Sequence, residues 1–361
     1  GQPGDHLLLG SSVIGDALRG VVIAAKDEAP RLERRLLRQA LLLPRTAVED
    51  FAGRLRRAAA ALPASLRTLK LNPTYGFSIP PLNEGLERLE IEDIHEQGLL
   101  GPLPNSLKEL WLSWIAAEIT IPPLPTGLKV LSIQSAVVPL SMPDIANTQL
   151  ERLLLYDLHY AFSLAGTVFP ETLRYLYLDS GQEGINAIPP LPAGLDSLHV
   201  YFCPWLTELP ALPDSLKVAK LMELAVPAVP SLPAKLEELV CMQLPNVTEV
   251  PELPHSLRRL YLDDLPINCL PLLPDSLELL ELGNTGNFFA GEGVLCLPNE
   301  PPNCLITGGN TWLLELCSVM NSLCPSQNPG IGGRVFHDLN INGMLDDGEP
   351  GCNYVSLLVE P

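Results

Sequence analysis

Apolar residues recur along this chain in a fixed pattern, with polar residues between them. Residues 253–262 read LPHSLRRLYL, and the pattern LPxSLxxLxL returns along the chain at a nearly constant step. The last Leu of each LPxSL unit, or of its looser versions, falls at residues 66, 86, 107, 128, 150, 173, 195, 216, 236, 257 and 277. Successive units are therefore 20 to 23 residues apart. A step of this length indicates many similar small units stacked on one another.

Each unit carries the signal of a short strand followed by an extended return. Leu195, Leu198 and Val200 alternate with polar or aromatic residues, as in a strand with one buried face. The prolines at 189, 190 and 192 precede this strand and favour an extended, polyproline-like segment. We therefore predict an α/β repeat solenoid of the leucine-rich-repeat type, mostly β. Its parallel strands line a concave face, and its convex side is polyproline-like and without helices.

Composition divides the chain into four parts. Residues 1–60 are rich in Arg and Ala and have apolar residues at helical spacing, which predicts a small helical N-terminal cap. A basic helix pair that binds a partner is the alternative. Residues 61–290 hold about eleven repeats, residues 291–326 form a Cys-rich C-terminal cap, and residues 327–361 form a partial calcium-binding β module.

The charge of the chain is large, negative and unevenly placed. The net charge is -19. Residues 1–60 hold ten Lys and Arg against seven Asp and Glu, which gives +3 and leaves -22 for the rest. So acidic a body repels phosphate backbones and anionic membranes, which argues against nucleic acid as a partner. No run of 18 apolar residues occurs, so we expect no membrane insertion.

Six of the eight cysteines crowd toward the C-terminal end, and they contain no CxxC pair. This spacing favours disulfides over a zinc site and predicts an oxidising, extracytoplasmic setting. Six cysteines allow 15 pairings, among which the sequence does not choose. These six are Cys269, Cys296, Cys304, Cys317, Cys324 and Cys352. Cys241 sits at a core position of its repeat and predicts a buried free thiol, whereas Cys203 follows a strand without an obvious partner.

A calcium-binding loop is the strongest chemical motif of the chain. Residues 338–349 fit the twelve-residue loop in which oxygen ligands alternate with other residues and a Gly permits the sharp turn. Strand-like segments flank the loop on both sides. The alternative is a polar surface turn that binds nothing. The predicted Ca²⁺ ligands are Asp338, Asn340, Asn342, Met344 through its backbone carbonyl, Asp346 through water, and Glu349.

Aromatic and sulfur-containing residues gather at the outward positions of the predicted concave strands. An exposed aromatic stripe indicates a surface for a protein or glycan partner. The alternative is that aromatic residues simply suit strands. The candidate contact residues are Trp111, Tyr156, Tyr175, Tyr177, His199, Tyr201, Met222, Met242 and Tyr261. Charged residues join them, with Arg88, Glu90 and Glu92 early, Asp179 centrally, and Arg259, Asp263 and Glu281 late.

Motifs of common enzymes are missing from the sequence. It contains no G-x-S-x-G, no HExxH and no phosphate-binding loop, and its six histidines are scattered. We therefore expect a chain that is not an enzyme.

The repeated LPxSLxxLxL phrase resembles the proline-rich bacterial leucine-rich-repeat class over about residues 60–320. That class includes secreted effectors of enteric pathogens and Bacteroidota surface proteins exported by the type IX system. Some of the effectors carry a ubiquitin-ligase domain with a nucleophilic Cys, but the flanks here are too short for that domain. The Asn that usually follows the strand in such repeats is largely missing.

Residues 333–359 resemble the start of the B-type domain of staphylococcal Sdr adhesins, on the sequence GRVFHDLNINGMLDDGEPGCNYVSLLV. The resemblance implies a calcium-binding, immunoglobulin-like β-sandwich, of which only the beginning is present.

Together these features predict a non-enzymatic, secreted or cell-surface bacterial protein. Its concave face would bind a protein or glycan and mediate adhesion, and Ca²⁺ would stiffen the module that joins it to further domains. The alternative is a structural spacer or scaffold subunit of a larger cell-surface assembly. A partner that contacts the concave aromatics would favour recognition. A contact made only through 1–60 or the C-terminus would favour the scaffold.

Overall fold

The structure is a computed structural model of the chain. It describes residues 6–9, 65–72, 79, 82–95, 97, 100–158, 162–181, 185–267, 270–283, 296–299, 301–308 and 315–316.

The described residues contain fifteen strands and no helix. They are β1 (His6–Leu9), β2 (Thr68–Leu71), β3 (Arg88–Ile94), β4 (Glu109–Ile115), β5 (Val130–Ala136), β6 (Arg152–Leu158), β7 (Tyr175–Asp179), β8 (Ser197–Cys203), β9 (Val218–Leu224), β10 (Glu238–Met242), β11 (Arg259–Asp263), β12 (Leu279–Leu282), β13 (Cys296–Leu297), β14 (Leu305–Thr307) and β15 (Glu315–Leu316).

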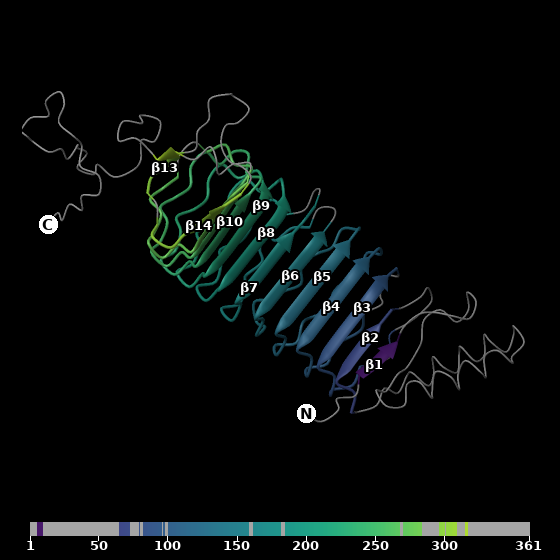
Figure 1. The fold of residues 1–361 in the computed structure, drawn as a ribbon. Coiled ribbons are helices and arrows are strands. Elements are labelled where there is room, and N and C mark those ends of the chain that lie inside the picture. Colours follow the sequence, from purple (N-terminus) through teal and green to yellow (C-terminus); the bar gives the residue numbers. More distant parts are fainter. Residues whose placement is uncertain are drawn as a thin grey trace, which may run out of the picture.

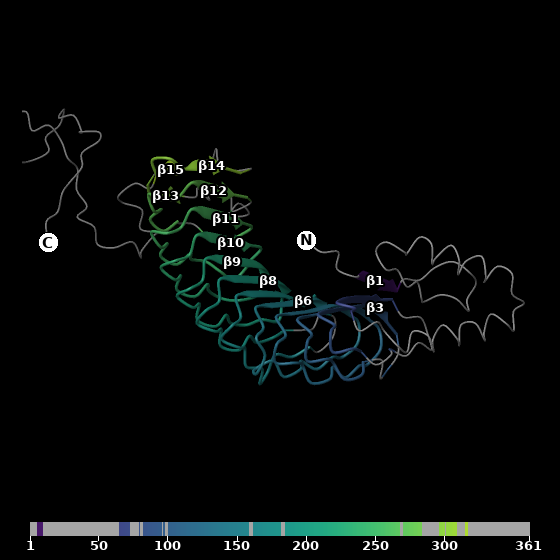
Figure 2. The same cartoon turned by 90° about the horizontal axis from the view of Figure 1, so that it is seen from below.

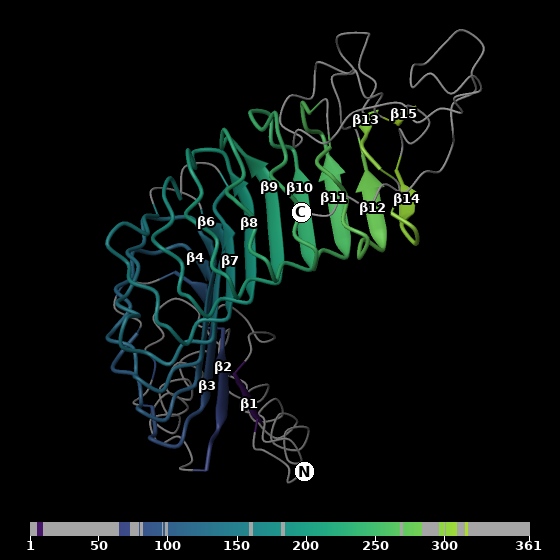
Figure 3. The same cartoon turned by 90° about the vertical axis from the view of Figure 1, so that its left-hand side faces the viewer.

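The eleven predicted repeats each supply one strand, β2 to β12, of a single parallel sheet (Figure 1). Figure 2 shows the described repeats following an arc, with the strands on its inner side and the connecting segments on its outer side. Figure 3 shows the same sheet bending along its length. The predicted parallel-strand solenoid of leucine-rich-repeat type is therefore confirmed. Its connecting segments are extended and contain no helix among the described residues, as the prolines predict.

Equivalent residues of neighbouring repeats stand side by side because the strands pair without a shift in register. Leu198 on β8 lies opposite Leu176 on β7 and Ala219 on β9. The buried residues consequently form continuous rows, and the alternation predicted for Leu195–Tyr201 is confirmed, with Leu195, Leu198 and Val200 buried. Each fully buried Leu contributes roughly 1.5–3 kcal/mol relative to an exposed one.

The phrase LPxSL makes a turn that also bonds to the repeat before it. The amide of Leu257 donates to the carbonyl oxygen of Pro254 at 3.0 Å. The hydroxyl before the last Leu donates to a Leu carbonyl of the preceding repeat at 2.6–2.9 Å in the units that hold Ser106, Thr172, Ser215, Ser256 and Ser276. These bonds link successive repeats at the start of the strands and satisfy carbonyl groups there.

A left-handed residue lies at the end of the strand in eight of the repeats, either as its last residue but one or directly after it. Asp93, Trp114, Ser135, Asp157, Phe202, Glu223, Gln243 and Asp264 have φ angles of 49–58°. The residue after each of them is apolar and buried, as Ile94 and Leu224 are. That buried position is where the usual Asn would stand, so the missing Asn is replaced by an apolar residue that the left-handed turn directs into the core.

Both ends of the sheet extend beyond the predicted repeats. At the N-terminal end, β1 pairs with β2 and so covers an open strand edge. The helices predicted within 1–60 lie outside the described residues. At the other end, β14 pairs with β12.

Cys304 precedes β14, and its amide donates to the carbonyl of Pro301 at 3.3 Å. It thus occupies the Leu position of a twelfth unit and packs against the core. Its thiol is free, so the prediction of a disulfide is wrong for this residue. The side chains of the other five C-terminal cysteines lie outside the described residues.

Two further thiols are buried in the sheet. Cys241 is free and buried, as predicted, and burial raises its pKa to about 12. Cys203 does not follow a strand but ends β8, where it fills the last core position of its repeat. Burial raises its pKa to about 11, and Ser180 Oγ lies 3.4 Å from its Sγ. High pKa values and burial make both thiols unreactive.

The buried rows predict a sharp contrast between two leucines. Leu260 is fully buried, whereas Leu272 is 56% exposed. We expect Leu260→Ala to lower the free energy of unfolding by about 2–5 kcal/mol, because it leaves a cavity. Leu272→Ala should change it by no more than about 0.5 kcal/mol. Urea unfolding followed by circular dichroism measures both. Equal effects would contradict the assignment of the core rows.

Candidate functional site

The predicted concave contact residues all lie at outward positions of the sheet. Their side chains are less exposed than the sequence predicts. Most are half-buried, because neighbouring side chains in the same row cover them, and Tyr156 is the most open at 43%. The prediction that Asp179 is an exposed charge of the concave face is wrong, because its side chain is buried, with 7% exposure, at the end of β7.

Five aromatic side chains from three adjacent strands form one cluster at the centre of the concave face. Tyr177 contacts Tyr201 edge to face with ring centroids 5.2 Å apart, and contacts Tyr156 at 5.9 Å. The ring of His199 lies 5.1 Å from that of Tyr175 and 5.8 Å from that of Tyr201. The zero register shift produces this cluster, because it places Tyr177 directly opposite His199. We call these five residues the aromatic centre.

His199 is the polar core of the aromatic centre. Its Nδ1 lies 3.4 Å from the hydroxyl of Tyr175 and 3.5 Å from that of Tyr201, and its Nε2 lies 3.1 Å from Ser197 Oγ. Burial, helped by the charge of Lys220, lowers the pKa of His199 to about 4. Burial also raises the pKa of Tyr177 far above its ordinary value. The aromatic centre is therefore uncharged at neutral pH and presents rings and hydroxyl groups.

Sulfur-containing and aliphatic residues continue this surface toward the C-terminal repeats. Met222 stands beside Tyr201 in the sheet, and Met242 stands beside Met222. Polarisable Met side chains adapt to the shape of an apolar partner. Trp111 and Tyr261 lie outside the aromatic centre, on β4 and β11.

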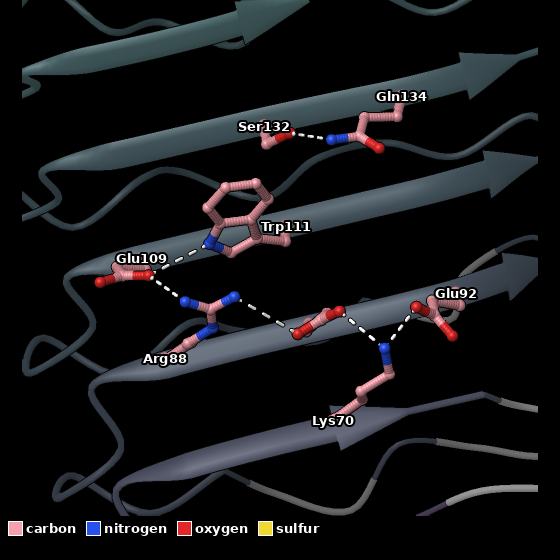
Figure 4. Close-up of polar contacts among 8 residues, drawn as sticks. Lys70, Arg88, Glu92, Glu109, Trp111, Ser132 and Gln134 are labelled. Atoms are coloured by element: carbon pink, nitrogen blue, oxygen red, sulfur yellow. Dashed lines mark hydrogen bonds and ion pairs between the residues drawn. The ribbon is translucent and has the colours of Figure 1, made fainter. Parts of the chain in front are cut away.

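Ion pairs flank the aromatic centre on its N-terminal side (Figure 4). Lys70 bonds to Glu90 at 2.8 Å and also to Glu92, and Arg88 bonds to Glu109 at 2.8 Å. Trp111 is part of this network, since its Nε1 donates to Glu109 at 3.2 Å and the Arg88 guanidinium lies 4.9 Å from its ring centroid. Each of these three carboxylates therefore has a cation within the same face.

A second ion cluster flanks the aromatic centre on its C-terminal side. Glu238 accepts from Lys220 at 2.7 Å and from Arg259 at 2.8 Å. Burial alone would raise the pKa of Glu238, but the bonds from Lys220 and Arg259 outweigh burial, and its pKa is lowered. Glu238 is thus ionised and neutralised internally.

Arg152 is the exception among the concave cations. It lies over the ring of Tyr175, 5.0 Å from the ring centroid, and forms no ion pair with a carboxylate in the described part of the chain. A guanidinium held flat against an aromatic ring keeps donors for a carboxylate of a partner.

No metal cluster is present among the described residues, in which no three His, Cys, Asp or Glu side chains converge. The predicted Ca²⁺ ligands, Asp338, Asn340, Asn342, Met344, Asp346 and Glu349, lie outside those residues. No helix in the described ranges is long and apolar enough to cross a membrane.

A hollow of about 440 Å³ lies away from the concave strands, between the segments 140–145 and 163–168. Asp144 is the single ionisable residue in its lining. This hollow therefore lacks the paired acid and base that most catalytic sites use.

Comparison with known proteins adds no family. No family model matches the sequence, and no curated protein matches it either. Among solved structures, YopM from Yersinia enterocolitica WA-314 is 20% identical with a TM-score of 0.46, and the match covers 71% of this chain and 60% of that one. The circular LRR protein CroV588 is 18% identical with a TM-score of 0.37, and the match covers 71% of this chain and 48% of that one.

The LRR protein LIC12759 of Leptospira interrogans is 17% identical with a TM-score of 0.26, and the match covers 61% of this chain and 79% of that one. The present chain thus spans less than two thirds of the first two structures. Its leucine-rich-repeat architecture is established by its own parallel sheet and buried leucine rows.

The lowered pKa of His199 predicts a pH dependence of stability. The unfolded chain takes up a proton on this residue near its ordinary pKa of 6.5, whereas the folded chain does so only at about 4. The stabilising contribution is therefore present above pH 6.5 and is lost as the pH falls from 6.5 to 4. We expect His199→Gln to flatten the dependence of unfolding free energy on pH in this window. Urea unfolding at several pH values measures it, and an unchanged slope would contradict the prediction.

Proposed function

We propose that the chain is a non-enzymatic binding protein that recognises a protein partner through the aromatic centre of its concave face. The observation that carries this proposal is the contrast along that face. Most of its charges are already paired with one another, while five aromatic side chains form an uncharged patch between them.

This contrast matters for the energy of binding. A partner that covers paired charges loses their hydration and gains little, whereas burial of half-exposed rings is favourable. Tyr and Arg are enriched among the residues that dominate protein interfaces. Met222 and Met242 extend the patch with flexible apolar surface, which suits apolar side chains of a protein better than a sugar. Arg152 beside the patch would add a polar anchor.

The cellular setting is part of the same proposal. Two features support the assignment as a secreted or cell-surface protein of bacterial type. They are the C-terminal cysteines other than Cys304 and the acidic composition of the chain, which favours solubility. Adhesion through the concave face, with further domains beyond this module, would fit that setting.

Replacement of two tyrosines tests the proposed recognition. The immobilised full chain would capture partners from extracellular protein, and a glycan array would be probed in parallel. We expect Tyr177→Ala with Tyr201→Ala to weaken binding of a captured protein at least tenfold without unfolding the chain. Val168→Ala serves as the control, since Val168 is 64% exposed and lies away from the concave strands.

Two results would contradict the proposal. One is capture that is unchanged by the double substitution, which would favour the scaffold function. The other is binding on the glycan array alone, which would replace the protein partner by a carbohydrate.

We propose, in addition, that residues 338–349 bind Ca²⁺. The support is the sequence motif, which supplies oxygen ligands at each expected position. Calorimetric titration of the full chain with CaCl₂ should show one site with a dissociation constant of about 10⁻⁵ to 10⁻³ M. Asp338→Asn with Glu349→Gln should abolish it, and Asp275→Asn should leave it unchanged. Absence of binding at millimolar Ca²⁺ would refute the site.

A further inference from the structure

The strand ends facing away from the LPxSL turns form a second surface, separate from the aromatic centre. We define this C-terminal rim as the left-handed residue of each of the eight repeats that have one, together with the four residues that follow it. Because all strands are parallel, these residues lie along one edge of the sheet. Among its described residues, three large aromatic side chains stand on this rim, namely Trp114 at 63% exposure, Trp205 at 57% and Phe202 at 41%.

Trp114 and Phe202 occupy an unfavourable backbone conformation. Their φ angles are 54° and 49°, in the left-handed region where bulky residues are rare. Six other repeats place Asp, Ser, Glu or Gln at this position. Asp93 and Asp157 gain local bonds there, from Asn72 Nδ2 at 3.0 Å and from Ser135 Oγ at 2.9 Å. The two exposed rings are not buried in the core, so the fold gives no reason for aromatic residues at these positions.

Positive charge is confined to one edge of the sheet, whereas carboxylates stand at both edges. Every Lys and Arg in the range 66–308 lies near the start of a strand. Each is one of the three residues before a strand or one of its first three residues. The C-terminal rim therefore carries no Lys or Arg. Its described residues do carry carboxylates from five repeats, which are Asp93, Glu118, Asp157, Glu223 and Asp264.

We propose that the C-terminal rim binds a cationic segment of another protein. Arg or Lys side chains would lie over the faces of Trp114, Phe202 and Trp205, where cation–π attraction is strongest for Trp. The surrounding carboxylates would attract the same cations and steer their approach. Nucleic acids and anionic glycans are repelled by this surface. A wholly apolar peptide would cover these carboxylates without supplying a cation to compensate for their lost hydration.

The spacing of the aromatic residues sets the length of the segment. Trp114 is on β4 and Phe202 is on β8, four strand spacings apart. At about 4.8 Å per spacing this separation is roughly 19 Å, which an extended peptide of about six residues spans. An Arg-rich decapeptide is therefore long enough to contact both.

The probe is a fluorescent decapeptide with four arginines, and the control peptide has glutamine in place of each arginine. The fluorescence anisotropy of each peptide would be measured with the full chain at several salt concentrations. We expect Trp114→Leu with Phe202→Asn and Trp205→Leu to weaken binding of the arginine peptide at least tenfold. Leu keeps apolar surface but removes the aromatic face. Asn suits the left-handed conformation, so Phe202→Asn alone should keep or raise the melting temperature.

A charge-matched pair of variants separates rim binding from general attraction to an acidic protein. Asp157→Asn, Glu223→Gln and Asp264→Asn neutralise the rim. Glu87→Gln, Glu151→Gln and Glu278→Gln remove the same charge from the opposite edge, where these side chains pair with Lys108, Lys129 and Arg258. We expect the rim triple to weaken binding at least tenfold and the opposite-edge triple by less than threefold.

Equal weakening by the two triples would overturn the proposal, as would unchanged binding in the aromatic variant. Equal binding of the glutamine peptide would overturn it too. The rim residues are distinct from the aromatic centre, so failure here would leave the proposed concave-face recognition standing.

Discussion

The in-register stacking of one short strand upon the next is the constraint on which this structure depends. Each repeat buries leucines that no single repeat could enclose, so its neighbours complete its core. The Ser and Thr hydroxyls of the LPxSL turns bond to the preceding repeat at one end of the strands. A left-handed residue at the other end returns the chain to the core. These hydroxyl bonds and left-handed residues, together with the backbone hydrogen bonds between strands, fix how each repeat is placed on the one before it.

This stacking also decides what the surface can do. Since outward residues line up across strands, one aromatic residue per repeat becomes a row, and neighbouring rows become the cluster around His199. The same alignment lets Lys70 reach two carboxylates and lets Glu238 accept from cations on both neighbouring strands. Apart from Arg152, the cations of these concave strands are thereby paired with carboxylates on the same face, and the uncharged aromatic centre lies between the two sets of ion pairs.

The sequence predicts much of this fold because the physics is local and repeated. Alternation in Leu195–Tyr201 sets the buried face, and the prolines exclude helices from the convex side. Other features depend on contacts with the neighbouring repeat, and the pattern within one repeat does not predict them. The burial of Asp179 and the bond from Ser256 to the Leu236 carbonyl are of this kind. Cys304 could have been recognised, since Pro301 to Cys304 repeats the turn phrase with Cys in place of Leu.

The aromatic centre, between internally paired charges, is the surface that we propose for recognition. Hydrogen–deuterium exchange of the full chain, with and without a captured protein partner, tests it most directly. We expect slower exchange on binding in β6 to β9, at residues 152–158, 175–179, 197–203 and 218–224. Protection confined to the convex segments, or to residues 1–60, would contradict it.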